Sequence, residues 1–245
     1  MRRERQRIVL RDGCRVNVVV TGAGPELILL HGFSGSALGW GRAVDGLSRR
    51  HRLVLVDLLG HGLSDKPRHA ERYRMEEVVA DVEEVVRRFR PPVDLLGYSM
   101  GGRVALATAL STPELVRRLV LESASPGLST MEERAVRVAS DEALADRISR
   151  GGIDAFLEAW RGLPLFRSLE TALSPEGLGR LEAQRASNDP SALAAVLRGL
   201  GTGRQPSLWA SLPSLTRPTL LLTGRRDSKF TALAESMVAC LPHAR

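Results

Sequence analysis

The chain has 245 residues, 43% hydrophobic and 26% charged, which suits one large folded domain with room for an insertion. No apolar run approaches the ~20 residues of a membrane span, and no signal-type apolar stretch follows the arginine-rich start, so we expect a cytoplasmic protein without a membrane span. The net charge of +7 comes from arginines spread along the chain without a nucleic-acid-binding signature, which argues against a nucleic-acid partner, and the distant Cys14 and Cys240 exclude a disulfide framework.

The N-terminal third reads as a hairpin followed by buried strands. Residues 7–22 alternate apolar and polar positions on either side of Asp12-Gly13, a dipeptide that favours a tight hairpin turn. Short apolar runs that end in turn residues then predict parallel strands buried on both faces. These runs are LILLHG (27–32), LVLVDLLGHG (53–62), VDLLGYS (93–99), LVLESAS (119–125) and TLLLTGRRD (219–227).

Helical periodicity fills the segments between these runs. Valines recur every three or four residues in 75–89, and a second helical stretch occupies 101–110. Alternation of strands and helices predicts an α/β fold with a mostly parallel, doubly wound sheet.

Residues 126–206 interrupt this alternation and predict helices only. A capping box at Ser129 and Glu132 and the pairs Ser174-Pro175 and Asp189-Pro190 mark helix starts. We therefore expect a discontinuous core, residues 1–125 and 207–245, with a helical cap at 126–206. Because ligands bind at the carboxyl ends of parallel strands, a cap leaving from one of those ends would roof the site.

The stretch GYSMG places Ser99 in the pattern G-x-S-x-G, between an apolar strand and a helix. That context predicts a nucleophile elbow, a sharp turn that exposes the serine oxygen; the alternative is an ordinary loop serine. Two backbone N–H groups should face it as an oxyanion hole, one from Met100 and one from Phe33 in HGFSG. We interpret His31 as shaping that turn.

The sequence indicates an acid partner for Ser99 but no suitably placed histidine. Asp227 follows a late strand and is the predicted acid, with a helix N-cap as the alternative role and Glu122 as the second candidate. A histidine should follow the acid, but only His243 does, and no further strand is present to carry it. We expect the natural chain to continue past Arg245 with a last strand, the histidine and a helix; the alternatives are a natural inactive protein and an active His243.

Together these landmarks resemble the α/β-hydrolase superfamily. Five more specific stretches, ESASPGL (122–128), EERAVRVASD (132–141), WRGLPLF (160–166), GTGRQPSLW (201–209) and RRDSKF (225–230), are similar to one of its families, the MenH family of 2-succinyl-6-hydroxy-2,4-cyclohexadiene-1-carboxylate synthases in menaquinone biosynthesis. That resemblance implies a lyase without cofactor or metal. The serine acts as a base relayed through histidine, pyruvate leaves, and a conjugated diene forms.

The resemblance also implies a substrate with three carboxylates, which arginines bind in two-point geometry. The family's substrate-binding positions fall on Arg103, Arg137, Arg185, Tyr98 and Trp160, with Lys229 and His31 as further candidates. The alternative to substrate binding is that each arginine is a helix residue exposed to solvent or held in an ion pair. We expect Asp57, His61, Ser64 and Asp65 to stabilise a turn.

Two other functions stay open at this point. A hydrolase of the same fold would use the same serine but has no need of three inward-facing arginines. A non-catalytic binding protein would use the pocket without chemistry, and the missing histidine is its only support. In either case we expect a small-molecule ligand and a monomer or homodimer.

Overall fold

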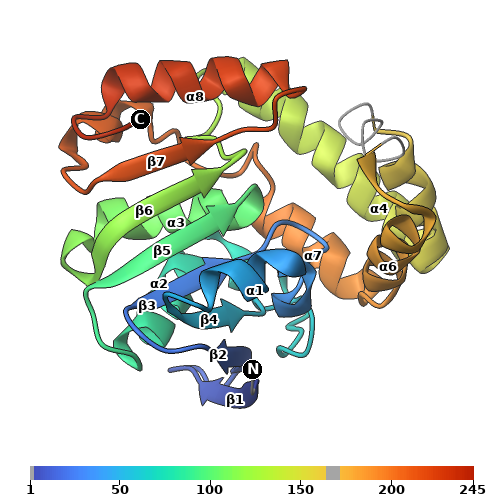
Figure 1. Cartoon of the computed structure of the whole chain (residues 1–245). Coiled ribbons are helices and arrows are strands. Elements are labelled where there is room, and N and C mark those ends of the chain that lie inside the picture. Colours follow the sequence, from blue (N-terminus) through green and yellow to red (C-terminus); the bar gives the residue numbers. More distant parts are fainter. Residues whose placement is uncertain (1–2, 164–171) are drawn as a thin grey trace.

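The structure, a computed structural model, describes residues 3–163 and 172–245, which form a layered α/β core with a helical cap on one side (Figure 1). The described residues contain a seven-stranded sheet in the order β1-β2-β4-β3-β5-β6-β7. Its strands are β1 (Glu4–Val9), β2 (Arg15–Thr21), β3 (Glu26–Leu30), β4 (Arg52–Val56), β5 (Val93–Tyr98), β6 (Val116–Glu122) and β7 (Thr219–Leu222).

The five predicted parallel strands are confirmed. β3 to β7 pair in parallel, while β1 and β2 join the sheet antiparallel. The predicted hairpin is confirmed as well, but its connection spans residues 10–14 instead of a two-residue turn. Gly13 takes a positive φ of 85°, and Leu10 N–H donates to the Cys14 carbonyl at 2.8 Å. This longer loop carries Asp12 out toward a neighbouring helix.

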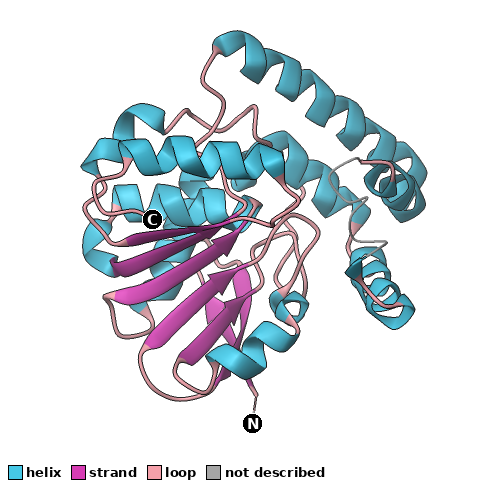
Figure 2. Cartoon of the chain, turned by 45° about the horizontal axis from the view of Figure 1, so that its top comes forward, coloured by secondary structure: helices cyan, strands magenta, loops and turns pink. Residues whose placement is uncertain are grey.

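Helices cover both faces of the sheet (Figure 2). Buried side chains of α2 (Met75–Arg87) and α3 (Met100–Ser111) pack with Ile28, Val54 and Leu95 on one face. On the other face, Val44 of α1 (Arg42–Leu47) packs against Leu29 and Leu55. Residues of one strand therefore alternate between two apolar layers, which explains why the strand sequences are apolar throughout.

The described part of 126–206 contains helices and no strand, as predicted: α4 (Met131–Arg161), α6 (Pro175–Ala186) and α7 (Pro190–Leu200). The fully buried Phe156 and Leu193 hold α4 against α7. The capping box was placed one residue too early, because the spacing fits two pairs and the helix uses Thr130 with Glu133. Of the stretch WRGLPLF, residues 164–166 lie outside the described residues.

The caps predicted at the two proline pairs are confirmed. Ser174 Oγ accepts from Gly177 N–H at 3.2 Å, and Asp189 Oδ1 accepts from Ala192 N–H at 2.8 Å. Each proline then occupies the first turn of its helix, where a missing N–H costs nothing. The starts of α6 and α7 are thereby defined by local chemistry.

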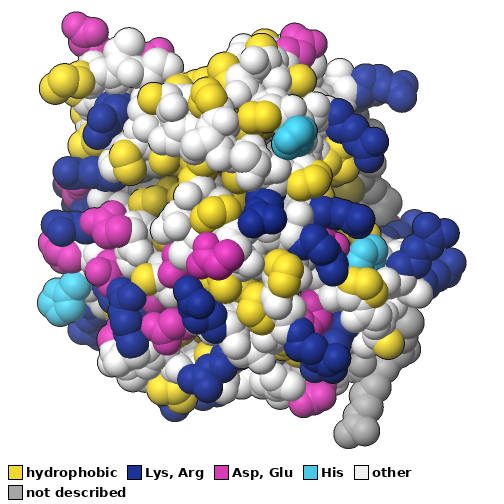
Figure 3. Space-filling view, turned by 90° about the vertical axis from the view of Figure 1, so that its left-hand side faces the viewer, with side chains coloured by type: hydrophobic (Ala, Val, Ile, Leu, Met, Phe, Trp, Pro, Cys, Tyr) yellow, Lys and Arg dark blue, Asp and Glu magenta, His cyan; other side chains and the backbone are white. Residues whose placement is uncertain are grey.

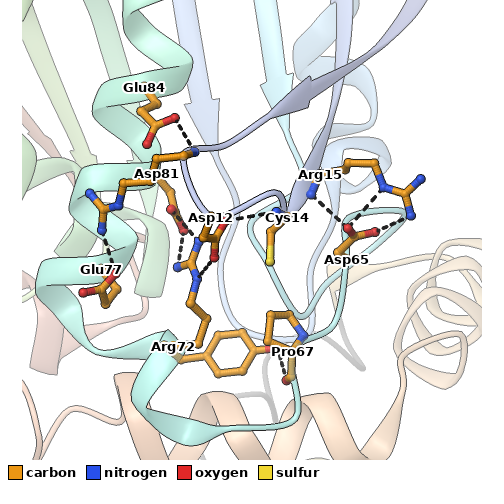
Figure 4. A network of polar contacts seen from close by, with 11 residues as sticks. Asp12, Cys14, Arg15, Asp65, Pro67, Arg72, Glu77, Asp81 and Glu84 are labelled. Atoms are coloured by element: carbon orange, nitrogen blue, oxygen red, sulfur yellow. Dashed lines mark hydrogen bonds and ion pairs between the residues drawn. The ribbon is translucent and has the colours of Figure 1, made fainter.

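An ion-pair network fastens the hairpin to the core (Figure 4). Arg72, in the short 3-10 helix η2 (Ala70–Tyr73), donates to Asp12 at 2.6 Å and to both oxygens of Asp81 at 2.8 Å. Beside it, Arg11 pairs with Glu77 of α2 at 2.6 Å. The β1–β2 hairpin is thus tied to α2 by charge-assisted hydrogen bonds as well as by backbone pairing.

On the face opposite the cap, arginine and lysine side chains alternate with acidic and apolar ones (Figure 3). Ion pairs also join neighbouring strands, such as Arg117 of β6 with Asp94 of β5 at 2.8 Å. Within residues 3–163 and 172–245, no helix is both long enough and apolar enough to cross a bilayer.

Candidate active site

Ser99 sits on the sharp turn that the sequence predicts. It follows β5 directly, precedes α3, and has a positive φ of 51° with ψ −111°. Its N–H donates to the Glu122 carbonyl at 2.8 Å, which holds the strained backbone in place. The turn also needs a residue without a side chain at position 101, since a Cβ there would collide with the Leu30 carbonyl. The geometry is that of a nucleophile elbow.

The loop after β3 lies beside the serine. A Cβ on Gly32 would come within 3.4 Å of the Ser99 Cβ and 2.8 Å of the Tyr98 ring, so the loop and the elbow are in contact distance. We call residues 32–36 the oxyanion loop. Ser34 within it has a positive φ of 59°, and Gly35 N–H donates to the Gly32 carbonyl at 2.9 Å. Met100 directly follows Ser99, and Phe33 directly follows Gly32; their role as oxyanion donors stays a prediction.

The carboxyl ends of β5, β6 and β7 bring the two acid candidates to one area. Tyr98 is aligned with Glu122, which in turn is aligned with Leu222 at the end of β7. Burial raises the pKa of Tyr98, and the negative charges of Glu122 and Asp227 add to that rise. Burial also raises the pKa of Glu122.

Asp227 begins α8 (Ser228–Cys240), and its Oδ1 accepts from Phe230 N–H at 3.1 Å. Asp227 therefore caps α8, the alternative role that the sequence suggested. It does so after β7, at the same end of the sheet as Ser99.

His243 lies at the wrong end of the sheet for a role beside Ser99. Its carbonyl accepts from Thr219 N–H at 2.9 Å, and Ala244 forms a parallel bridge with Thr219, the first residue of β7. Ser99 follows the carboxyl end of β5, about 10 Å away along the strand direction. The structure thus brings Ser99, Asp227 and Glu122 to one end of the sheet and leaves His243 at the other.

Arg103 and Arg137 form a second group with a buried carboxylate. Arg103 is 8% exposed and donates to Gln205 Oε1 at 2.9 Å and to the Leu200 carbonyl at 2.8 Å. Burial lowers the pKa of Arg103 to about 10, helped by the positive charge of Arg137. Arg137, half-exposed, donates to Asp141 at 2.9 Å. Burial raises the pKa of Asp141 against the opposing effect of both arginines.

The remaining basic candidates differ in position. Arg185 of α6 is half-buried, and burial lowers its pKa while the nearby Tyr98 acts in the opposite direction, so the two side chains are neighbours. Lys229 is exposed, with its ammonium 5.8 Å from the centroid of the Phe230 ring. Arg185 thus interacts electrostatically with Tyr98 next to Ser99, whereas Lys229 lies on the exposed surface of α8.

Aromatic side chains join the oxyanion loop to the cap. The Phe33 ring centroid lies 5.2 Å from that of Trp160 and 6.0 Å from that of Phe156, both in α4. On its other side Phe33 meets the buried His61 at 5.8 Å. Burial lowers the pKa of His61 to about 3, so this ring is neutral at physiological pH.

His31 does not have the geometry of a substrate ligand. It is 3% exposed, its Nδ1 hydrogen-bonds the Gly32 carbonyl at 2.8 Å, and its Nε2 accepts from Leu58 N–H at 3.1 Å. Both ring nitrogens are therefore engaged by backbone, and burial lowers the pKa of the ring. His31 shapes the turn, and the substrate-binding assignment is corrected accordingly.

The predicted turn residues do stabilise the backbone around the loop. Asp57, 3% exposed, accepts from Ala37 N–H at 2.5 Å, from Asn17 Nδ2 at 2.8 Å and from Leu63 N–H at 2.9 Å. Ser64 Oγ donates to the Asp57 carbonyl at 2.5 Å. These bonds connect the end of the oxyanion loop with β2 and the turn after β4.

Several polar residues around the site carry no signal in the sequence. Gln205 positions Arg103, Asp141 pairs with Arg137, and Asn188 with Gln184 joins α6 to the oxyanion loop. Asn188 stands in ASNDP, where it reads as a turn residue ahead of a helix cap. Only its burial and its long-range partner distinguish it from an ordinary turn asparagine.

No group of three or more histidine, cysteine, aspartate or glutamate side chains in the described ranges is arranged to hold a metal ion. A cavity of about 200 Å³ lies behind the oxyanion loop, lined by Ser36, Ala37, Asp57, Gln184 and Asn188 among others.

Comparison with known proteins gives concordant matches. A family model described as the alpha/beta hydrolase fold matches residues 25–244. The chain is 40% identical over 241 residues to a Bacillus subtilis (strain 168) protein assigned provisionally as a 2-succinyl-6-hydroxy-2,4-cyclohexadiene-1-carboxylate synthase, covering 97% of this chain and 87% of that protein. It is 35% identical to the synthase of that name from Salmonella paratyphi C, covering 88% and 82%. The solved structure of MenH from S. aureus superposes with a TM-score of 0.87 at 30% identity, covering 94% and 87%.

Proposed function

The chain belongs to the α/β-hydrolase fold family and, within it, to the 2-succinyl-6-hydroxy-2,4-cyclohexadiene-1-carboxylate synthases, and from this membership we propose that it is a pyruvate-eliminating lyase of menaquinone biosynthesis. Its substrate would be 2-succinyl-5-enolpyruvyl-6-hydroxy-3-cyclohexene-1-carboxylate. The observation that carries the proposal is the combination of a serine elbow with buried and half-buried arginines under the cap.

The proposed reaction is a 1,4-elimination. Ser99 would pass its hydroxyl proton to a base, the family's histidine or the imidazole added in the assay, and so remove the proton from the ring carbon next to the succinyl carbonyl; the electron pair shifts into the ring. The carbon–oxygen bond to the enolpyruvyl group then breaks, so the ring becomes a conjugated diene and the leaving group tautomerises to pyruvate. Phe33 and Met100 N–H groups would stabilise the negative charge on the succinyl oxygen, as donors aimed at a developing oxyanion do.

The arginines fit the substrate's charge. Arg185 beside Tyr98 would bind one carboxylate close to the reacting carbon. Arg137 is half-exposed and already paired with a carboxylate, Asp141, so its guanidinium is oriented for a second one. Arg103 is different, because two of its N–H groups already donate to Gln205 and to the Leu200 carbonyl. It would mainly supply positive potential and hold the C-terminal end of α7 in position.

A paired assay tests the proposal. Diene formation is followed by near-ultraviolet absorption and pyruvate by a coupled dehydrogenase, on the wild-type chain and on Ser99→Ala, with and without added imidazole as an external base. Equal rates of diene and pyruvate formation that Ser99→Ala lowers by orders of magnitude support the lyase. A matched control, Ser111→Ala at the end of α3, should keep the wild-type rate.

Two outcomes contradict it. Turnover of p-nitrophenyl esters without diene indicates a hydrolase of the same fold. Tight binding of the substrate without turnover under any condition, unchanged in Ser99→Ala, indicates a binding protein.

A further inference from the structure

One side chain connects the cap to the oxyanion loop. Asn188, at the end of α6 and only 9% exposed, directs its Nδ2 toward the Ser34 carbonyl at 3.0 Å. The same nitrogen donates to the carbonyls of Arg185 at 3.0 Å and Gln184 at 3.2 Å, the last turn of α6. The Asn188 Nδ2 atom therefore bridges the end of α6 in the cap and the oxyanion loop of the core. Asn188 and Ser34 are 154 positions apart in the sequence.

The loop at this point needs external support. Ser34 has a left-handed backbone although it carries a Cβ, a conformation that persists only when the surroundings hold it. The cavity of about 200 Å³ lies behind residues 35–38, so apolar packing does not fill the space into which the loop could withdraw. A second and longer polar contact between α6 and the loop joins Gln184 Nε2 to Ser36 Oγ at 3.4 Å.

On the opposite side, the Phe33 ring rests on α4 through Trp160 and Phe156. The two neighbouring residues Phe33 and Ser34 are thus held from two cap helices, one through a ring and one through a carbonyl. The backbone N–H of Phe33 is on the same residue as the first attachment and one residue before the second.

We propose that Asn188 is a positioning residue that couples substrate recognition by the cap to the oxyanion hole. The inference rests on the proposed function, because it takes Arg185 as a carboxylate ligand and Phe33 as an oxyanion donor. Asn188 binds the Arg185 carbonyl and the Ser34 carbonyl at once, so a carboxylate that draws Arg185 into place also fixes the Ser34–Gly35 peptide, and with it the residue that directly follows Phe33. Binding of the substrate carboxylate and alignment of the Phe33 N–H would then occur together.

The first test uses the ligand-free chain. Amide hydrogen exchange of the Gly35 N–H, which closes the loop on Gly32, is measured by NMR in wild type, Asn188→Ala and Ser187→Ala. We expect at least tenfold faster exchange in Asn188→Ala. Ser187→Ala removes a hydrogen bond to the same Gln184 carbonyl without touching the loop, so it should leave that rate unchanged. Should Asn188→Ala fail to fold, Asn188→Ser, which is too short to bridge, takes its place. Equal exchange rates in all variants overturn the proposal.

The second test uses the compound 2-succinyl-6-hydroxy-2,4-cyclohexadiene-1-carboxylate as the ligand. In wild type, its binding should shift the Phe33 amide resonance; in Asn188→Ala the ligand should still bind, with an affinity within about tenfold, while the Phe33 shift is lost. A full Phe33 shift in Asn188→Ala overturns the coupling. Failure of the wild-type chain to bind the compound counts against the proposed function instead, and the exchange experiment still decides whether Asn188 holds the loop.

Discussion

Replacing Asp57 with asparagine should destabilise the protein far more than a change of one atom suggests. The buried carboxylate accepts three hydrogen bonds, one on Oδ1 and two on Oδ2. An amide offers a single acceptor oxygen, so its NH₂ group must face an N–H donor. If that group replaces Oδ2, Asn17 can rotate its amide to accept, since its Oδ1 is buried without a partner among the described residues. One backbone donor, at Leu63 or Ala37, still loses its acceptor in either orientation.

The size of the effect follows from these contacts. An unpaired buried donor costs about 1–3 kcal/mol, and the bonds that remain lose the strength a charged acceptor gives them. We expect Asp57→Asn to lower the free energy of unfolding by about 2–4 kcal/mol, a large part of the roughly 5–15 kcal/mol typical of a domain.

Urea unfolding followed by tryptophan fluorescence measures this loss. Asp45→Asn, on the exposed side of α1, is the control and should stay within about 0.5 kcal/mol of wild type. A loss below about 1 kcal/mol in Asp57→Asn would refute the reasoning, since it would mean that water or a rearranged backbone replaces the missing acceptor.

Four further substitutions test other parts of the fold. Gly101→Ala should prevent folding or lower the free energy of unfolding by more than about 3 kcal/mol, measured by thermal denaturation, because the new Cβ would collide with backbone atoms. Gly179→Ala, in open space on α6, should instead raise the free energy of unfolding by about 0.5–1 kcal/mol. Phe156→Ala should lower the free energy of unfolding by about 3–5 kcal/mol in urea, because the side chain is fully buried in the cap. The hydrogen bond from Arg72 lowers the pKa of Asp12 from 3.8 to about 2, so its contribution is complete above pH 4 and lost as the pH falls from 4 to 2. Because Asp12 is one-third exposed, wild type should lose only about 1 kcal/mol more than Asp12→Asn across that range, and parallel pH profiles of the two would contradict this.

The strands and the elbow were predictable because each has a local cause. The apolar runs that become β3 to β7 are buried on both faces, and Ser99 stands between a strand and a helix that the pattern already defines. Helix starts at Ser174 and Asp189 were equally readable, since the cap residue and proline are adjacent in sequence. The cap start was ambiguous by one residue, because two overlapping pairs satisfy the same spacing.

The supporting residues were not predictable, because their partners are far away in the sequence. Asn188 contacts the core 154 positions earlier, and Gln205 meets Arg103 across 102 positions. Both look like ordinary loop residues in the chain. His31 shows the converse: its place after a strand fits a site residue, and only the backbone atoms around its two nitrogens show that it serves the turn.

The charged first strand bears on how the protein behaves at high concentration. β1 ends the sheet on one side, and its Glu4, Arg5 and Arg7 side chains are exposed to solvent. A terminal strand offers unpaired backbone groups to any other extended chain, which is how many proteins begin to aggregate. Docking a second copy there would force guanidinium groups together and strip water from them. The charges on the edge of the short N-terminal hairpin therefore disfavour fibre-like self-association.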